Sequence, residues 1–529
     1  MQFLKRQFKQ ICEGGVETSV HKITKVFRVV LMSLSAPLAV HLNLNWPKAY
    51  GYVSSMHIKQ LKKIRSQSVQ DRTAITKLEK ITISYLKRVV DAGPHRAGLQ
   101  DWIDACHRLG GFYFLQGRMN ETNELYQNEA EVRKGIAQRH QWDDLGIEFL
   151  PDYLAGGSIG NYECLDVYLK AGFLGLSPSK KLLLLVPPGS PVTNPCYLEY
   201  WRRYVAVISD PQLIKILEPL RKQLTVPLNK YMVLDQKVHK SFLAVGTIRE
   251  QWVKENRPPL LQLSMIDQDR GWQSLTAFGV RPGEWFVGLH VREQGWKDNG
   301  SRAEEFRNAD IKDYIPAIQA VTDAGGWVVR MGDATMKPLP PMPRVIDYVH
   351  SSAKSDWMDI FLCAASRFFI ATSSGPYTVA MAFGTPVVAT NFLPTCCAYY
   401  MTSQDIFIPR LCKLKQTGDW VNFSELFSPR FGTAAVQSIY DDENIEAVSN
   451  TQQDIKDVVG EMLDRCSGSL RYTEEDESLQ SAFWKVGAAC GRQYGPEHTV
   501  IHARMGRNFL KTHSGLLPSQ RDVHAGVQC

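Results

Sequence analysis

Apolar residues recur along this chain with two different periods, and the change of period divides the sequence. From residue 61 to 148, Leu, Ile and Tyr recur at intervals of three and four residues, which is the spacing of helices that bury one face. From residue 149 onward, short continuous apolar runs alternate with longer segments of helical period. Continuous apolar runs are typical of strands covered on both faces, so we expect parallel sheets flanked by helices.

The first α/β region is predicted over residues 149–265. Its predicted elements are strands at 181–188 and 205–209 and a helix at 197–204. A glycine-rich segment, GGSIGN, precedes the first helical segment of this region. Such a turn either lets a ligand approach the backbone closely or simply caps the helix. Its candidates for the acceptor side of a binding site are Gly156, Gly157, Gly160 and Asn161.

A second α/β region is predicted over residues 266–465. Its strands are expected at 285–291, 326–332, 344–348, 367–372 and 385–391. Its helices are expected at 309–325, 355–365 and 375–384. Ligands of open parallel sheets bind beyond the carboxyl ends of the strands. The polar residues expected to converge there are His290, Arg292, Asp333, His350 and Ser373 to Gly375.

The turn after the fourth of these strands carries the clearest chemistry. It consists of Ser373, Ser374, Gly375 and Pro376, and a helix follows it. A helix N-terminus presents unpaired N–H groups and the positive end of the helix dipole, which favour an anion. Arg292 follows a parallel strand and can close over the same anion from the other side. The two segments together predict a clamp for a diphosphate.

The first 60 residues are basic and apolar. The apolar run at 26–44 is interrupted by Arg28, Pro37 and His41, so it falls short of the roughly 20 apolar residues that span a bilayer. It forms either a helix lying on an anionic membrane face or a helix packed on the protein's own surface. A cleaved signal peptide is not expected, because the apolar part begins late and basic residues surround it.

Two further segments are predicted to be helical. Within residues 61–148, Trp102, Tyr113 and Tyr126 fall close to the spacing of a tetratricopeptide helix pair. A single pair is not an array, so a hairpin that supports the next domain is favoured over a peptide-binding solenoid. The tail at 466–529 begins acidic and then takes a helical period, which predicts a C-terminal helical tail.

Composition narrows the class of protein. With 529 residues, of which 44% are hydrophobic and 22% charged, the chain can bury more than one core. The net charge of +7 is modest for this length and does not require a nucleic acid partner, although it suits contact with phosphates or an anionic membrane. The 11 cysteines are odd in number and show no Cys-x-x-Cys spacing. This pattern excludes a disulfide scaffold and favours the cytoplasm.

Two α/β regions with these motifs resemble bacterial GT-B glycosyltransferases. The stretches that carry the resemblance are GLHVREQGW, RNADIKDYIPAI, GGWVVRMGD, VIDYVHSSAKSDWMDIFL and ATSSGPYTVAMAFGTPVVATN. The HVR at 290–292 is similar to a motif of fucosyltransferases that use GDP-fucose, and SSGPYTVAMAFGTPVV is similar to the donor loop of heptosyltransferases. Glu293 departs from the second basic residue common in fucosyltransferases, which leaves the sugar and the base of the donor open.

The resemblance implies the fold and the reaction. The fold is two facing Rossmann-like domains with an N-terminal helical extension. The reaction is transfer of a hexosyl or deoxyhexosyl group from a nucleotide diphosphate sugar to a glycan, lipid-linked or protein acceptor. Arg292 would contact the diphosphate, and the Ser-Gly-Pro turn would cradle it. The Asp-x-Asp at 267–269 lies in a polar segment and is expected to be a solvated turn, so we expect no metal and no cofactor.

The general base and the nucleoside contacts have several candidates. His290, Glu293 and Asp310 are candidates for the base. Each has a plain alternative: His290 hydrogen-bonds a neighbouring loop, Glu293 is a surface charge, and Asp310 caps a helix that begins at Ile311. The candidates for base and ribose recognition are Asp333, which is otherwise an ordinary turn residue, with His350 and Ser351.

Two other functions remain compatible with the sequence. One is a nucleotide sugar epimerase or hydrolase of the same fold, which would release product without an acceptor. The other is a scaffold or binding protein in which the helical region carries the function and the cleft is catalytically inactive. The expected place of the protein is the cytoplasm, either free or peripheral on the cytoplasmic membrane face.

Overall fold

A computed structural model describes residues 47–65, 72–235, 237–293, 304–494 and 500–518. The chain forms two compact units, one up to Phe112 and one from Tyr113 on. The predicted amphipathic segment at 26–44 lies outside the described residues. Across the described part of the chain, no helix combines the length and the apolar character that crossing a bilayer demands. The domain limits predicted from the sequence stay predictions.

The first unit is built from helices. Its elements are α3 (Pro47–Arg65), α4 (Arg72–Asp91), α5 (Gly93–Ala97) and most of α6 (Leu99–Leu115). Helices α3 and α4 pack against each other. Trp102 is buried, and its indole N–H donates to the Val90 carbonyl at 3.0 Å. The tetratricopeptide pattern that includes this tryptophan stays a prediction.

The second unit begins with α7 (Met119–Arg139) and continues into a first α/β part. Its strands β1 (Ile147–Phe149), β2 (Lys181–Leu185) and β3 (Val205–Ile208) form a parallel three-stranded sheet in that order. Its larger helices are α9 (Tyr162–Phe173), α10 (Pro195–Trp201) and α11 (Pro211–Leu224). A hairpin of β4 (Tyr231–Leu234) and β5 (Lys237–Lys240) leads to α12 (Ser241–Lys254). The two strands and the helix predicted here are confirmed.

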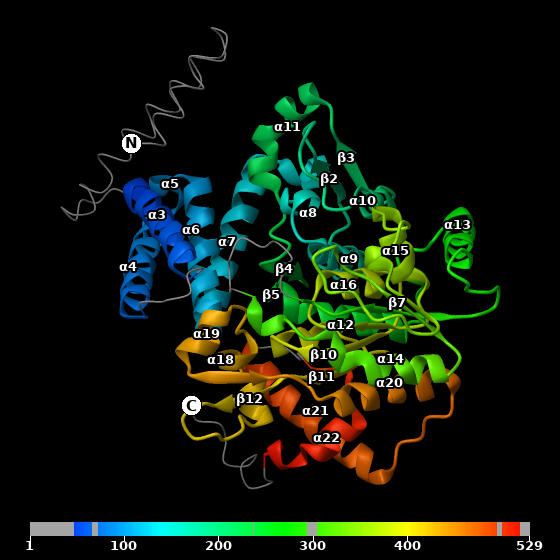
Figure 1. Ribbon diagram of the computed structural model, residues 1–529. Helices are drawn as coiled ribbons and strands as arrows, with labels where there is room; N and C mark the ends of the chain where they lie inside the picture. Colours follow the sequence, from blue (N-terminus) through cyan, green and yellow to red (C-terminus); the bar gives the residue numbers. More distant parts are fainter. Residues whose placement is uncertain (1–46, 66–71, 236, 294–303, 495–499, 519–529) are drawn as a thin grey trace. The chain divides into compact units, whose positions relative to one another are not determined.

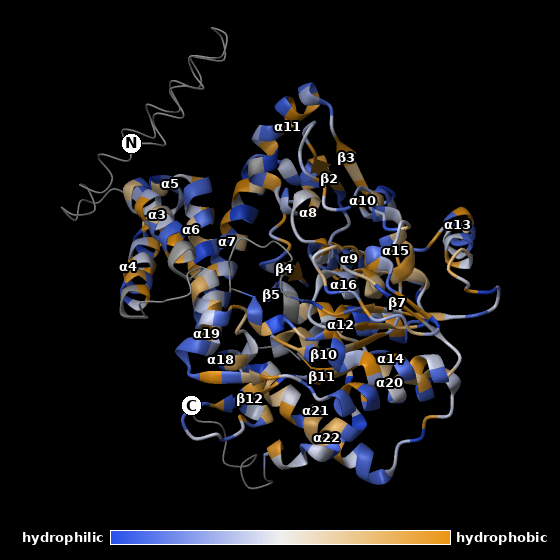
Figure 2. Ribbon diagram, viewed as in Figure 1, coloured by the Kyte–Doolittle hydropathy of each residue, from blue (hydrophilic) through white to orange (hydrophobic). Residues whose placement is uncertain are grey.

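A larger parallel sheet forms the core of the second α/β part. The seven strands run in the order β14-β11-β10-β9-β6-β7-β8 (Figure 1). The five predicted strands are β6 (Phe286–His290), β7 (Trp327–Arg330), β8 (Val345–Ile346), β9 (Phe369–Ala371) and β10 (Val387–Phe392). The predicted helices are α14 (Ile315–Asp323), α15 (Asp356–Ala365) and α16 (Gly375–Ala382). Figure 2 shows that most residues of the neighbouring strands β10 and β11 are hydrophobic, and every residue of both strands is buried, as in strands covered on both faces.

Two strands of this sheet were not predicted. They are β11 (Ile406–Pro409) and β14 (Arg504–Met505). The predicted C-terminal helical tail contains α21 (Glu474–Tyr494) and α22 (Arg507–Thr512), with β14 between them. Strand β14 is only two residues long and belongs to the sheet because it pairs in parallel with β11. So short a segment has no hydrophobic period of its own, which is why the sequence pattern did not predict it.

The Asp-x-Asp segment was predicted as a solvated turn, and this prediction was wrong. Asp267 lies in the first turn of α13 (Met265–Thr276), which Ser264 caps. The Asp267 carboxylate accepts hydrogen bonds from the Tyr200 hydroxyl at 2.6 Å and the Trp357 indole at 2.9 Å. It therefore joins α13 to α10 and α15, and its oxygens are engaged in packing the two α/β parts. The fold class, α/β with two Rossmann-like parts and an N-terminal helical extension, is confirmed.

A tightly packed glycine in β6 provides a test of this core. A Cβ added at Gly288 would lie 2.5 Å from the Phe369 ring of the neighbouring strand. We therefore expect Gly288→Ala to lower the free energy of unfolding by about 1–3 kcal/mol through overpacking. The measurement is urea unfolding followed by circular dichroism.

Gly460 supplies the matched control for this prediction. It lies inside helix α20 (Gln452–Ser467), and an added Cβ would meet no atom within 4 Å. Gly460→Ala should therefore raise the free energy of unfolding by about 0.5–1 kcal/mol through helix propensity alone. Equal effects of the two alanines would contradict the packing assigned to Gly288.

Candidate functional site

The carboxyl ends of β6 and β9 bring together the two segments that the sequence analysis paired. The strands are parallel neighbours, with His290 in register with Ala371. The Thr372 N–H donates to the His290 carbonyl at 3.2 Å. The Arg292 N–H donates in turn to the Thr372 hydroxyl oxygen at 3.0 Å. Arg292 is therefore tied to the residue that opens the turn at Ser373 to Pro376.

A second arginine reaches the same turn and was not among the predicted site residues. Arg307 ends the 3-10 helix η3 (Glu305–Arg307). Its Nε and Nη2 donate to the Ser373 carbonyl at 2.8 and 2.5 Å. The only signal in the sequence was its position in the stretch RNADIKDYIPAI, next to the candidate Asp310. Nothing in that pattern indicates that its partner is a carbonyl 66 residues further along the chain.

The two guanidinium groups share one carboxylate. Glu304 Oε2 lies 2.7 Å from Arg292 Nη2 and 3.5 Å from Arg307 Nη1. Burial lowers the pKa of Arg292, the positive charge of Arg307 lowers it further, and Glu304 opposes both effects. Arginine nevertheless stays protonated in proteins. The site therefore holds two neighbouring positive charges, and Glu304 is a carboxylate that contacts both of them.

The N-terminus of α16 adds the partial positive charge of a helix end. The helix begins at Gly375 without a side-chain cap from Ser374. The buried Ser374 hydroxyl has no hydrogen-bond partner in the described chain, whereas Ser373 Oγ accepts from the Leu393 N–H at 3.1 Å. Pro376 lacks an N–H, so the donors of this first turn come from its neighbours. A buried hydroxyl that has no hydrogen-bond partner in the protein and lies beside a helix N-terminus is suited to donate to an anionic ligand.

His290 is buried and uncharged at this edge of the sheet. Its Nδ1 atom has no hydrogen-bond partner among the described residues, so this atom does not bond the neighbouring loop as the plain alternative expected. Burial lowers the pKa of His290 to about 4, the positive charge of Arg292 acts in the same direction, and Asp333 opposes them. A charged imidazole here would add a third positive group, so the neutral form is the stable one.

Glu293 and Asp310 have other partners. The buried Glu293 carboxylate accepts from the Lys337 N–H at 2.8 Å and lies 3.5 Å from Arg330 Nη2. The alternative that Glu293 is a surface charge was therefore wrong. Asp310 accepts from the Lys312 N–H at 3.0 Å and caps the 3-10 helix η4 (Ile311–Tyr314), as its plain alternative stated. Catalytic roles for both residues stay predictions.

The candidates for base and ribose recognition make local contacts. Asp333 accepts from the Thr335 N–H at 2.9 Å, which makes it a turn residue. The His350 ring hydrogen-bonds the Met336 carbonyl at 3.0 Å, and the Ser351 hydroxyl donates to the Tyr348 carbonyl at 2.9 Å. These contacts fix the loop after β8 (Val345–Ile346). Recognition of a nucleoside by these side chains stays a prediction.

The glycine-rich loop of the first α/β part contacts the turn of the second. A Cβ added at Gly375 would lie 2.6 Å from Ile159 Cγ2 and 3.3 Å from the Gly160 nitrogen. A Cβ at Gly160 would in turn lie 3.5 Å from the Gly375 Cα atom. The two loops that the sequence analysis selected separately therefore touch. Only glycine at 375 leaves room for this approach.

The other three candidate residues of the glycine-rich loop maintain the conformation of that loop. A Cβ at Gly157 would lie 2.3 Å from the Tyr153 carbonyl, and one at Gly156 would lie 2.8 Å from the Pro191 carbonyl. The Asn161 amide donates to the same Tyr153 carbonyl at 3.4 Å. Packing thus accounts for these residues, and ligand contacts for them stay predictions.

A buried ionic cluster lies directly after this loop. Arg249 of α12 is 2.7 Å from Glu163 and 3.4 Å from Asp166, both on α9. Lys170 lies 2.9 Å from Asp166. Burial raises the pKa of Glu163, and Arg249 opposes this by favouring the carboxylate. Arg249 also donates to the Tyr400 carbonyl at 3.4 Å, so the cluster links the two α/β parts.

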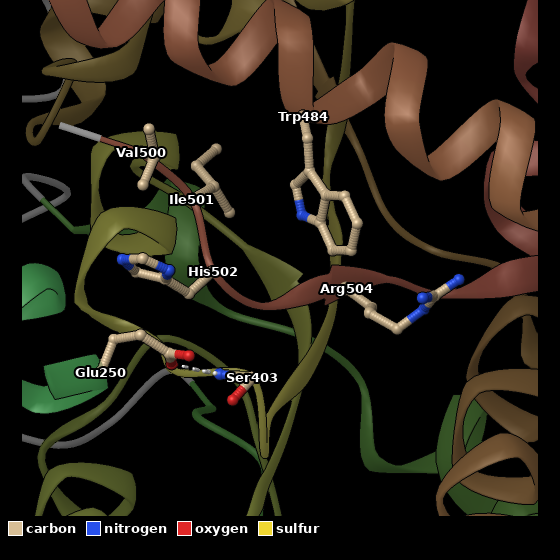
Figure 3. A pocket seen from close by; sticks show the side chains of 7 residues that line it. All are labelled: Glu250, Ser403, Trp484, Val500, Ile501, His502 and Arg504. Carbon is tan, nitrogen blue, oxygen red and sulfur yellow. Dashed lines mark hydrogen bonds between the residues drawn. The ribbon is translucent and has the colours of Figure 1, made fainter. Parts of the chain in front are cut away.

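A separate cavity of about 510 Å³ lies at the opposite edge of the large sheet (Figure 3). Its lining residues are Glu250, Ser403, Trp484, Val500, Ile501, His502 and Arg504. Ser403 precedes β11 and residues 500–503 precede β14, so the cavity lies at the amino ends of these strands. It contains none of the predicted site residues. Among the residues that the structure describes, no group of three or more His, Cys, Asp or Glu is arranged to hold a metal ion.

No protein-family model matches the sequence, and no curated protein matches it. Among solved structures, the chain is similar to a family 9 glycosyl transferase from Veillonella parvula, at 9% identity and a TM-score of 0.40, over 60% of this chain and 97% of the other. It is also similar to ADP-heptose LPS heptosyltransferase II of E. coli, at 14% identity and a TM-score of 0.29, over 50% and 89%. A third similar structure is an E. coli heptosyltransferase solved with ADP, at 14% identity and a TM-score of 0.24. The match covers 46% of this chain and 86% of the other. No residue's role is carried over from these proteins, and the similarity of the HVR motif to fucosyltransferases stays a prediction.

Because His290 is uncharged in the folded protein, we expect the free energy of unfolding to depend on pH. Its pKa is about 4 in the folded protein and near 6.5 in an unfolded chain. Between these values the unfolded chain binds a proton that the folded chain does not, so the free energy of unfolding falls as the pH is lowered from 6.5 to 4. This contribution is on the order of 3 kcal/mol and is fully present above pH 6.5.

His290→Asn removes the titrating group while keeping a polar side chain. The difference between the unfolding free energies of the wild type and the variant should therefore change across this pH window, whereas all other groups cancel. Urea unfolding at about pH 7 and about pH 4.5 measures it. The same pH slope in both proteins would show that His290 is not held neutral.

Proposed function

We propose that this protein is a glycosyltransferase that uses a nucleotide diphosphate sugar as its donor. The observation that carries the proposal is the arrangement of Arg292, Arg307 and the N-terminus of α16 around one turn at the carboxyl edge of the large sheet. Diphosphate is the common group of such donors, and it combines high negative charge with several oxygen acceptors. Two planar guanidinium groups and a helix end suit that charge and that geometry.

The same groups can act on the transition state. As the bond between the sugar and the diphosphate lengthens, negative charge builds on the leaving phosphate oxygen. Fixed positive groups that face this oxygen stabilise the transition state more than the ground state. Asn308 Oδ1 accepts from Arg292 Nε at 3.2 Å, and Ser373 O accepts from Arg307, so both guanidinium groups are held in place before the donor arrives. In this proposal the two arginines take the role that a metal has in other enzymes.

The acceptor is proposed to approach from the first α/β part, because its glycine-rich loop touches the donor turn at Gly375. Both His290 Nδ1 and Glu293 Oε1 are buried without a hydrogen-bond partner among the described residues, but the other oxygen of Glu293 is held by the Lys337 N–H and lies near Arg330. With a pKa of about 4, His290 is a weak base in the ligand-free protein. A bound diphosphate would raise that pKa by favouring the protonated form. We therefore propose His290 as the proton acceptor and leave Glu293 and Asp310 to their observed partners.

The finer features of the function are proposals that rest on the sequence. They are hexosyl or deoxyhexosyl transfer, a glycan, lipid-linked or protein acceptor, and a place at the cytoplasmic membrane face. The segment that would contact a membrane lies within residues 1–46, outside the described part of the chain.

Nucleotide binding is the first test of this proposal. Thermal unfolding is measured with ADP, GDP, UDP and dTDP and with their sugar conjugates, with divalent metal chelated. A ligand at about 100 times its Kd adds about 2.7 kcal/mol of stability, so one member of the panel should raise the unfolding temperature. A panel without any shift would support the scaffold alternative. Release of free sugar at full rate without an acceptor would support a hydrolase.

The second test removes one guanidinium group. Hydrogen bonds to charged groups are worth about 1.5–3 kcal/mol, so Arg292→Ala should lower turnover of the donor found in the panel by at least about tenfold. Arg430 is the matched control, because it is an exposed arginine paired with Glu443 at 2.6 Å in a different region. Arg430→Ala should turn over normally. Near-normal turnover by a folded Arg292→Ala protein would remove Arg292 from the mechanism.

A further inference from the structure

The carboxylate between the two arginines is more exposed than the groups it joins. The Glu304 side chain is 46% exposed, whereas those of Arg292 and Arg307 are 13% and 23% exposed. Glu304 therefore covers a pair of largely buried cations from the solvent side. Glu304 forms an ion pair with each arginine, and its carboxylate remains accessible to water.

The two guanidinium groups do not depend on Glu304 for their positions. Arg292 Nε is held by Asn308, and Arg307 is held by the Ser373 carbonyl. The segment that carries Arg307 is itself anchored by the buried Arg410, which donates to the Phe306 carbonyl at 2.9 Å and also to the Asn308 carbonyl. The Glu304 carboxylate can therefore leave without releasing the arginines.

The backbone at Glu304 is also fixed independently of its side chain. The Arg307 N–H donates to the Glu304 carbonyl at 3.1 Å and closes the turn that begins η3. Departure of the carboxylate needs only rotation about side-chain bonds, which takes picoseconds to nanoseconds for an exposed residue. Its cost is the loss of an ion pair whose carboxylate is 46% exposed, so water replaces part of what the carboxylate loses.

We infer that Glu304 is a displaceable counterion that occupies the place of the donor's diphosphate in the ligand-free protein. This inference rests on the proposed function. A diphosphate carries more negative charge than one carboxylate and can contact both guanidinium groups at once, so it displaces Glu304. A ligand with a single phosphate carries less negative charge, so it competes less well with the Glu304 carboxylate. Glu304 therefore weakens the binding of all anions and favours diphosphates over monophosphates.

The test measures the binding of inorganic pyrophosphate by calorimetry, with divalent metal chelated. Glu304→Gln keeps the shape of the side chain and removes its charge. Loss of a partly exposed ion pair that competes with the ligand should tighten pyrophosphate binding about two- to fivefold. The ratio of affinities for ADP and AMP should fall in the variant. Unchanged or weaker pyrophosphate binding would overturn the inference.

The matched control is Glu443→Gln, which removes the same charge from an exposed carboxylate that also pairs with an arginine at 2.6 Å. It should leave pyrophosphate binding unchanged. A second comparison separates displacement from a general effect of net charge. Each single arginine variant removes one of the two partners of Glu304, so the tightening caused by Glu304→Gln should shrink in both backgrounds. It should shrink more in Arg292→Ala, which removes the partner at 2.7 Å, than in Arg307→Ala, which removes the partner at 3.5 Å. If Arg292→Ala binds too weakly to measure, a reduced tightening in Arg307→Ala is the result expected.

The outcomes also separate this inference from the proposed function. The same tightening in every background would show that Glu304 acts only through long-range charge and would overturn displacement, with nucleotide binding untouched. If Glu304→Gln binds pyrophosphate more tightly but the protein binds no nucleotide sugar, the role of Glu304 as a displaceable counterion is supported. The proposed glycosyltransferase function is then contradicted.

Discussion

The parallel pairing of β6 with β9 is the constraint on which the candidate site depends. Because His290 lies in register with Ala371, the residues that follow the two strands leave the sheet at the same edge. Two hydrogen bonds through Thr372 then fix Arg292 beside the turn. A slip of one residue would send the side chain of Arg292 to the opposite face of the sheet. The Phe369 ring over Gly288 helps to set that register, so packing of the core and geometry of the site have one origin.

The turn is held from its other side by the first α/β part. Gly375 lies against Ile159 and Gly160, and the cluster of Arg249 with Glu163 follows within a few residues. Separating buried partners of this kind would leave charges without compensation, which costs several kcal/mol. The contact between the two loops is therefore supported by an interaction that resists rearrangement. Side-chain motion at the exposed Glu304 is easier than motion of the two parts.

The sequence predicted those features that depend on local pattern. The continuous apolar runs located the strands that end at His290 and Ala371, and the Ser-Ser-Gly-Pro turn marked the helix that follows. It could not predict partners brought together by tertiary structure. Arg307 contacts Ser373, and Asp267 joins Tyr200 to Trp357, across distances in sequence that no periodicity records. The contact of Gly160 with Gly375 has the same origin.

The electrostatics of the site follow from burying positive charge before any ligand is bound. Asn308 and the Ser373 carbonyl hold Arg292 and Arg307 through neutral oxygens, and Glu304 relieves part of the repulsion between the two guanidinium groups. His290 lies near Arg292, and burial keeps the imidazole neutral, which avoids a further positive charge at the site. A bound anion changes both features of the site. It replaces the Glu304 carboxylate next to the arginines, and its negative charge raises the pKa of His290. One change of charge would thus connect donor binding to the basicity of the group proposed to accept a proton.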